Sequence, residues 1–139
     1  MGAYAGILLR VVVGAIYLFQ AYLALFAATP RGLAGYLAKL NVPSPTILSV
    51  AVLAVHGLGG AMLLIGLWTR VAASLNAAVL LLGIVIVYVR QGVLLKGSVV
   101  DAAIGRTPDA GYEYVALLVA ATVLVAVSGG GGGSSAGRK

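Results

Sequence analysis

The sequence predicts an all-α integral membrane protein, a four-transmembrane-helix bundle with a short interfacial helix between spans 1 and 2. The 139 residues are 62% hydrophobic and 9% charged, and their mean hydropathy is +1.12. Nine basic and three acidic residues cannot supply the charged surface that a soluble domain of this size needs. Apolar runs near the roughly 20 residues that cross a bilayer recur along the chain, and we expect them to be helical, because helices satisfy their own backbone in lipid.

The four expected spans follow one another with polar or proline-containing breaks between them. The first covers about residues 4–28 and ends before "ATPRG". The second covers about residues 46–68 after "NVPSP", whose prolines can open a helix but cannot sit inside one. The third starts directly after Arg70 and reaches about residue 89, and the fourth, about residues 112–127, is the shortest.

The connections between the spans are unequal. Residues 29–45 contain "RGLAGYLAKL", where apolar side chains recur at helical spacing opposite Arg31 and Lys39, which predicts the interfacial helix. The letters "WTR" predict a tight hairpin, and residues 91–111 form a longer mixed loop. Both long connections follow odd-numbered spans, so we expect them on one side of the membrane and the two termini on the other.

The chain is expected to form one membrane domain over residues 1–127, followed by a disordered Gly/Ser-rich tail over residues 128–139. Its start is interpreted as the first span and not as a cleavable signal peptide, because no basic residue precedes Arg10 and the apolar run is too long. Basic residues are divided almost equally between the two sides, so charge counting does not decide the orientation.

The composition also limits the chemistry. With no cysteine and one histidine, the chain offers no thiolate for an iron–sulfur cluster and no second histidine for bis-histidine haem ligation, so we expect no covalently bound or metal-ligated cofactor. The net charge of +6 comes from residues that flank apolar segments, which indicates contact with anionic lipid headgroups and no binding to nucleic acid.

Polar residues inside a span are candidate functional residues, because burying them in lipid is costly. His56, the only histidine, and Tyr17 fall at similar depth near the middle of their spans, with Gln20 about one turn nearer the side of the long loops. His56 is either a neutral imidazole satisfied by a neighbouring side chain or, with Tyr17 and Gln20, the polar contact of a ligand such as quinone.

Arg10 and Asn76 are the other intramembrane polar candidates. Arg10 stands about 9 Å from the start of its span, so it can extend to the headgroups. The alternative is an inward arginine that binds an anionic group or pairs with Asn76 at the beginning of the third span.

Glycines concentrate where helices are expected to meet. Gly14 lies on the face of the first span that carries Tyr17, and "GLGG" with a later glycine marks the second span. Small residues allow close helix approach in lipid, so packing is the expected role of Gly14, Gly57, Gly59, Gly60 and Gly66.

An ion pair is expected where the third span ends and the fourth begins. Arg90 and Glu113 should lie at the same depth in that antiparallel hairpin, and tyrosines flank Glu113 as in an interfacial aromatic belt. A structural pair is favoured over a proton-handling Glu113.

Together these features resemble the DoxX family of small four-helix membrane proteins. The resemblance extends over about residues 8–125 and is carried by "LLRVVVGAIYLFQAYLAL", "GLAGYLAKLNVPSP", "GLGGAMLLIGLWTR" and "GYEYVALLVAA". Many members have a glutamate where His56 stands and a His-Gly pair where Gln20 and Ala21 stand, whereas Glu113 matches the family pattern. These differences weaken the case for catalysis more than the case for the fold.

The resemblance implies a multi-pass protein of the cell membrane, with cytoplasmic termini, in respiratory or redox-associated systems. Relatives include the membrane subunit of thiosulfate:quinone oxidoreductase. The leading hypothesis is a subunit that anchors or stabilises a larger respiratory or sulfur-oxidising oxidoreductase complex, without catalysis of its own and with a quinone contact left open. The alternatives are a quinone-binding redox subunit and, with too few polar positions for a hydrated pore, a small transporter.

Overall fold

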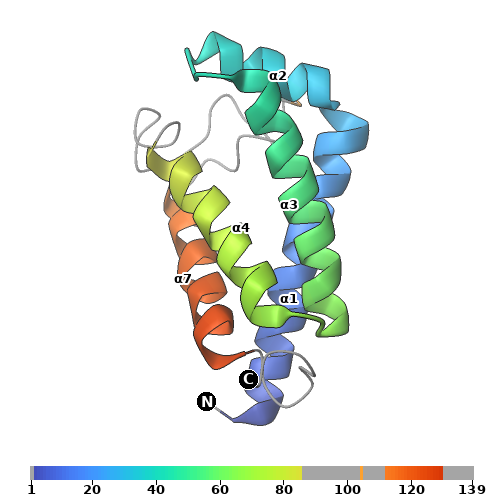
Figure 1. The fold of residues 1–139 in the computed structure, drawn as a ribbon, viewed down its shortest axis with the longest axis vertical. Helices are drawn as coiled ribbons and strands as arrows, with labels where there is room; N and C mark the ends of the chain where they lie inside the picture. Colours follow the sequence, from blue (N-terminus) through green and yellow to red (C-terminus); the bar gives the residue numbers. More distant parts are fainter. Residues whose placement is uncertain (1, 86–103, 105–111, 130–139) are drawn as a thin grey trace.

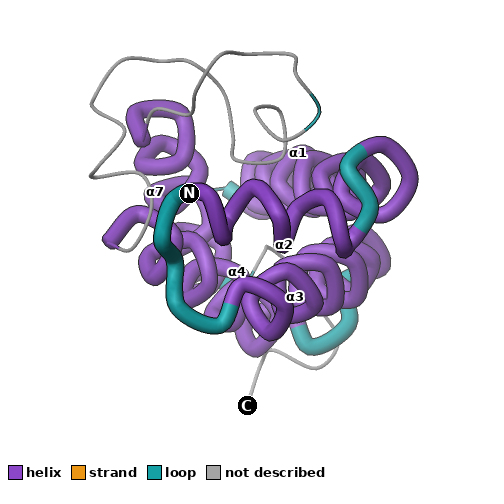
Figure 2. Tube along the Cα trace, turned by 90° about the horizontal axis from the view of Figure 1, so that it is seen from above, coloured by secondary structure: helices purple, strands orange, loops and turns teal. Residues whose placement is uncertain are grey.

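The computed structural model describes residues 2–85, 104 and 112–129 (Figure 1). Across these ranges the chain is helical and contains no strand. Lengthwise helices within them are α1 (Ala3–Tyr22), α3 (Pro45–Ile65), α4 (Thr69–Gly83) and α7 (Tyr112–Ser128). Helix α2 (Pro30–Lys39) lies crosswise over one end of this bundle, as the view from above shows (Figure 2).

The lengthwise helices pack as a closed ring. Helix α1 contacts α3, α3 contacts α4, α4 contacts α7, and α7 returns to α1. Neighbours in the ring run antiparallel, so the start of α1 and the end of α7 lie at the same end of the bundle (Figure 1). This is the up-and-down arrangement expected for helices joined by short connections, and the ring encloses buried side chains that include Val13, Tyr17, Leu63, Ala73 and Val125.

The outward faces of the bundle are apolar. Two stretches, Ala3–Ala27 and Pro45–Ile65, are long and apolar enough to cross a membrane, and they coincide with the first two expected spans. Over the described residues, α4 and α7 have 15 and 17 residues, fewer than the roughly 20 of a full crossing. Large hydrophobic side chains point away from the ring on all four helices, among them Leu8, Phe19, Leu58, Leu75 and Leu117.

The first span ends in a turn that ties it to α2. Helix α1 continues as a π-helical turn, η1 (Leu23–Ala27), and Thr29 then caps α2 by accepting a hydrogen bond from the Gly32 backbone N–H at 3.1 Å. The Ser49 hydroxyl on α3 donates to the Pro30 carbonyl at 2.7 Å. These bonds attach the start of α2 to the end of the first span and to α3. The helix expected within residues 29–45 is confirmed.

The turn between α3 and α4 is as tight as the sequence predicts. Gly66 adopts a left-handed conformation with φ 79°, which ends α3 three residues before the expected boundary because a helix cannot continue through it. The Leu67 N–H closes the turn on the Met62 carbonyl at 2.9 Å. Residues 86–103, 105–111 and 130–139, which hold the expected end of the third span, most of the mixed loop and most of the Gly/Ser tail, lie outside the described residues.

Helices α1 and α3 meet backbone to backbone at Gly14 and Gly60. A Cβ atom built on Gly60 would lie 2.8 Å from the Leu18 nitrogen and 3.0 Å from the Gly14 carbonyl oxygen, and one on Gly14 would lie 3.0 Å from the Gly60 oxygen. No side chain larger than hydrogen fits without moving a helix. Gly57 is different, because its Cβ would meet the Ala21 Cβ at an ordinary 3.6 Å.

We predict that Gly60→Ala destabilises the protein by about 1–3 kcal/mol, the usual cost of overpacking, whereas Gly57→Ala on the same helix changes stability by less than about 0.5 kcal/mol. Denaturant titration of both variants in the same detergent micelle measures the difference. Equal stability of the two variants would show that the α1–α3 contact is not tight.

Candidate functional site

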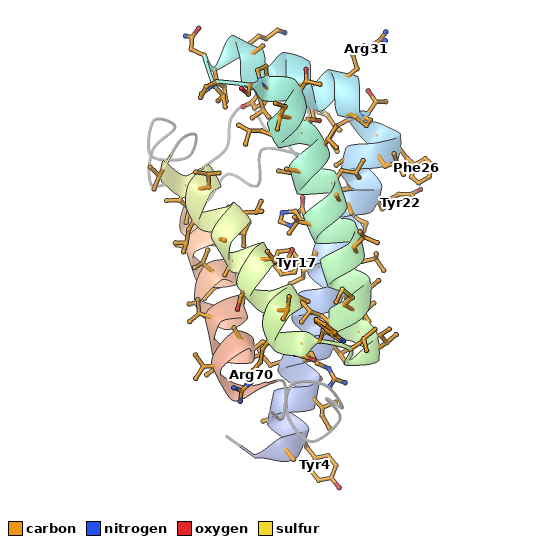
Figure 3. All side chains as sticks on the ribbon, in the orientation of Figure 1. Tyr4, Tyr17, Tyr22, Phe26, Arg31 and Arg70 are labelled. Carbon is orange, nitrogen blue, oxygen red and sulfur yellow. The ribbon has the colours of Figure 1, made fainter. Side chains whose placement is uncertain are left out.

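The structure brings Tyr17 and His56 into contact in the middle of the bundle. Their ring centroids lie 4.8 Å apart with the planes tilted by 33°, and Tyr17 is fully buried while His56 is 5% exposed. Figure 3 shows Tyr17 between the helices, far from both ends. The two residues therefore share the depth that their positions along the two spans predict.

His56 is held by Asn76 of α4. The His56 Nδ1 atom lies 2.7 Å from the Asn76 Oδ1 atom, and the Asn76 Nδ2 atom donates to the Ala72 carbonyl at 2.8 Å. Because the amide nitrogen is used on Ala72, the oxygen faces the ring and can only accept. His56 Nδ1 therefore carries the hydrogen, and in the neutral imidazole Nε2 is an acceptor.

Tyr17 is linked to α7 through Thr122. The two hydroxyl oxygens lie 2.6 Å apart, and the Thr122 hydroxyl donates to the Leu118 carbonyl at 2.7 Å. Since the Thr122 hydrogen is used there, the Tyr17 hydroxyl donates to Thr122. One residue from each of α1, α3, α4 and α7 thus joins a buried layer, the central network, formed by Tyr17, His56, Asn76 and Thr122.

Gly59 provides the space that the central network needs. A Cβ atom on Gly59 would collide with the Asn76 side-chain amide. Its role is to admit a polar side chain from α4, whereas Gly14 and Gly60 bring two backbones together. The glycines expected to serve one packing role therefore have different neighbours, and Gly66 belongs to the turn between α3 and α4.

Arg10 lies inside the bundle and does not extend outward to the headgroups. Its side chain is 6% exposed, so the inward alternative describes it. The pairing with Asn76 is not formed, because α4 begins at Thr69 and Asn76 stands about 10 Å further along it, at the level of His56. Gln20, the third candidate ligand contact, is buried about one turn from Tyr17 toward α2.

A family comparison fits these observations. The DoxX family model matches residues 5–89, more than half of the chain, from α1 through α4. The chain belongs to the DoxX family. Comparison with curated proteins and with solved structures gave no match.

The matched region of this DoxX protein contains three members of the central network, while Thr122 lies beyond it. Sequence reasoning missed Thr122 and also Thr69, which is fully buried at the start of α4. The available signal for Thr122 was its isolation, since it is the only hydroxyl residue between Tyr114 and Ser128. A lone hydroxyl in an apolar helix needs a partner inside the bundle.

The structure does not describe the side chains of two expected site residues, Arg90 and Glu113. Arg90 lies outside the described residues, and Glu113 belongs to α7 but its side chain is not described. The ion pair between them remains a prediction. Within the described residues, no group of three His, Cys, Asp or Glu side chains is close enough to hold a metal ion.

We predict that Asn76→Ala lowers the free energy of unfolding by about 1–3 kcal/mol, because it leaves the buried Nδ1–H of His56 without an acceptor. Tyr17→Phe keeps the ring contact and removes one interhelical hydrogen bond, which costs about 0.6 kcal/mol on average in membrane bundles. Unfolding titrations in detergent measure both losses.

The matched control is Tyr22→Phe. Tyr22 lies on the same helix but is exposed and contacts Phe26 through its ring, so losing its hydroxyl should change stability by less than about 0.5 kcal/mol. If Asn76→Ala were as mild as this control, the central network would not contribute to stability.

Proposed function

We propose that this DoxX protein is a four-span membrane subunit that anchors or stabilises a larger respiratory or sulfur-oxidising oxidoreductase complex. Helices α4 and α7 complete a closed ring with the two longer apolar helices, and their outward faces carry exposed leucines. A ring with an apolar exterior on every helix fits a bundle that crosses the bilayer as a unit. Four crossings also fit termini that share one side, the cytoplasm.

One observation carries the subunit role. The single histidine donates through Nδ1 to Asn76 and stacks on Tyr17, so it is a fixed part of the bundle interior. With no cysteine and no second histidine in the chain, this DoxX protein offers few ligands for an electron carrier. We infer that electron transfer uses cofactors of partner subunits.

The glycine surface of α3 does not serve for docking, because α1 already covers Gly60 and Asn76 fills the space at Gly59. The end of the bundle at α2 fits a partner better. Arg31 and Lys39 are exposed there, while Leu33 and Leu37 hold the helix to the bundle. Figure 3 places Arg31 at the opposite end of the molecule from Arg70.

We predict that the double variant Arg31→Glu with Lys39→Glu reduces co-purifying oxidoreductase subunits severalfold, because it reverses the charge of the docking end. Gentle detergent extraction of the native membrane, purification through this chain and identification of bound proteins measure the effect. The control is Arg70→Glu, an exposed arginine at the other end, which should retain the partners.

Loss of partners in Arg70→Glu as well, with normal recovery of the folded chain, would place the contact elsewhere. Recovery of this DoxX protein without any oxidoreductase subunit, even before substitution, would remove the subunit proposal and favour a test for transport in liposomes.

A second candidate function is a quinol contact at His56. The hydrogen bond of His56 to Asn76 favours it by fixing which ring nitrogen can accept a hydrogen bond from a ligand. Because Nδ1 is the donor, Nε2 of the neutral ring can accept a hydrogen bond but has none to give to a quinone carbonyl. A site at His56 would therefore bind the hydroxyl of a reduced quinol in preference to the oxidised quinone.

In an isolated complex, His56→Leu should then abolish quinol-dependent turnover and leave the subunit composition unchanged. Bound quinone and quinol are quantified in the same sample. Unchanged turnover in His56→Leu would assign His56 to the structural network alone.

A further inference from the structure

Two of the three guanidinium nitrogens of Arg10 are buried without a hydrogen-bond partner among the described residues. The residue is 6% exposed, and the two nitrogens are Nε and Nη1. A buried cation without a partner is costly in a bundle and in lipid. The chain places no acidic residue near it in sequence, because the first is Asp101, and Glu113 begins α7 at the opposite end of the bundle.

Contacts between α1 and α3 fix what Arg10 faces. Gly14 lies against Leu63 and Leu64, where an added Cβ would stand 3.0–3.1 Å from their atoms. Arg10 is one helical turn nearer the start of α1 on the same face, and α3 runs antiparallel to α1. One turn beyond Leu63 and Leu64 is the turn of residues 66–68, where α3 ends and α4 begins. Arg10 is therefore level with the start of α4.

The start of α4 supplies further donors. Thr69 is fully buried, and its Oγ1 atom has no hydrogen-bond partner among the described residues. The first backbone bond of the helix runs from Ala72 N–H to the Trp68 carbonyl at 2.9 Å, so the N–H groups of residues 69–71 precede the helical ladder. Trp68 provides no side-chain cap in the described structure. The positive end of the α4 dipole is therefore directed at the level of Arg10.

We propose that Arg10, Thr69 and the N-terminus of α4 form a binding site for a phosphate-bearing anion, either a phospholipid headgroup or free phosphate. The guanidinium provides a planar pair of donors that matches phosphate oxygens, and a helix N-terminus adds backbone N–H groups of the same polarity. An anion here would supply the counter-charge that the first 100 residues of the chain do not contain.

The site lies near the end of the bundle at which α1 begins. Arg10 is seven residues from the start of α1, about 10 Å along the helix. The same end of the bundle exposes Tyr4 and Trp68, the residue types that anchor helices at the membrane surface. Figure 3 shows Tyr4 and Arg70 at this end, remote from Arg31 on α2. The anion site is thus separate from the docking end and from the central network.

Native mass spectrometry of the full chain in mild detergent tests the proposal, with phosphatidylglycerol and inorganic phosphate as probes. The wild-type chain and Arg70→Gln, the exposed neighbouring arginine, should bind one anion per chain. Arg10→Gln should bind the same probe about tenfold or more weakly, as expected for loss of a charge-assisted hydrogen bond. Thr69→Val, which keeps the side-chain shape, should weaken binding to a smaller extent.

Thermal unfolding distinguishes the source of the phosphate. If phosphatidylglycerol raises the unfolding temperature and inorganic phosphate does not, the ligand is the lipid headgroup. If both probes raise the unfolding temperature, the site recognises the phosphate group alone. Arg10→Leu should be more stable than wild type without lipid, because it removes a buried charge, and should show no rise when the probe is added. Equal binding by Arg10→Gln and wild type, or no response of wild type to either probe, overturns the proposal.

Discussion

The close approach of α1 and α3 is the constraint on which the other buried groups depend. At Gly14 and Gly60 the two backbones touch where no side chain fits. Three residues along α1, Tyr17 is brought against His56. Four residues in the other direction, Arg10 is brought level with the start of α4. The contact between Gly14 and Gly60 therefore sets the positions, along the bundle axis, of both the central network and Arg10.

These two layers solve the problem of polar groups in lipid differently. In the central network, Asn76 and Thr122 each use a backbone carbonyl of their own helix as well as a side chain on another helix. At the level of Arg10, two guanidinium nitrogens and the Thr69 hydroxyl have no hydrogen-bond partner among the described residues. The hydrogen bonds of the first layer join side chains of different helices, and the second layer supplies the donors of a site that takes its acceptor from outside.

Hydropathy and glycine spacing were sufficient to predict the helical class, the shared depth of Tyr17 and His56, and a tight turn after the second span. The structure places that turn at residues 66–68, about two residues before the predicted "WTR". These patterns could not predict the hydrogen-bond partners, because the depth of a residue along its helix does not determine which neighbouring helix its side chain faces. Pairing of Asn76 with Arg10 was one alternative, but Asn76 stands seven residues into α4 and bonds to His56. The partner of Tyr17 required the position of α7 around the ring, which no local pattern encodes.

The bond between Tyr17 and Thr122 joins residues 105 positions apart, and it has a consequence for biogenesis. The chain emerges from the ribosome N-terminus first, so α1 is made long before α7. Until α7 arrives, the phenolic hydroxyl cannot form its hydrogen bond to Thr122. The last helix to be made therefore completes a hydrogen bond that begins on the first.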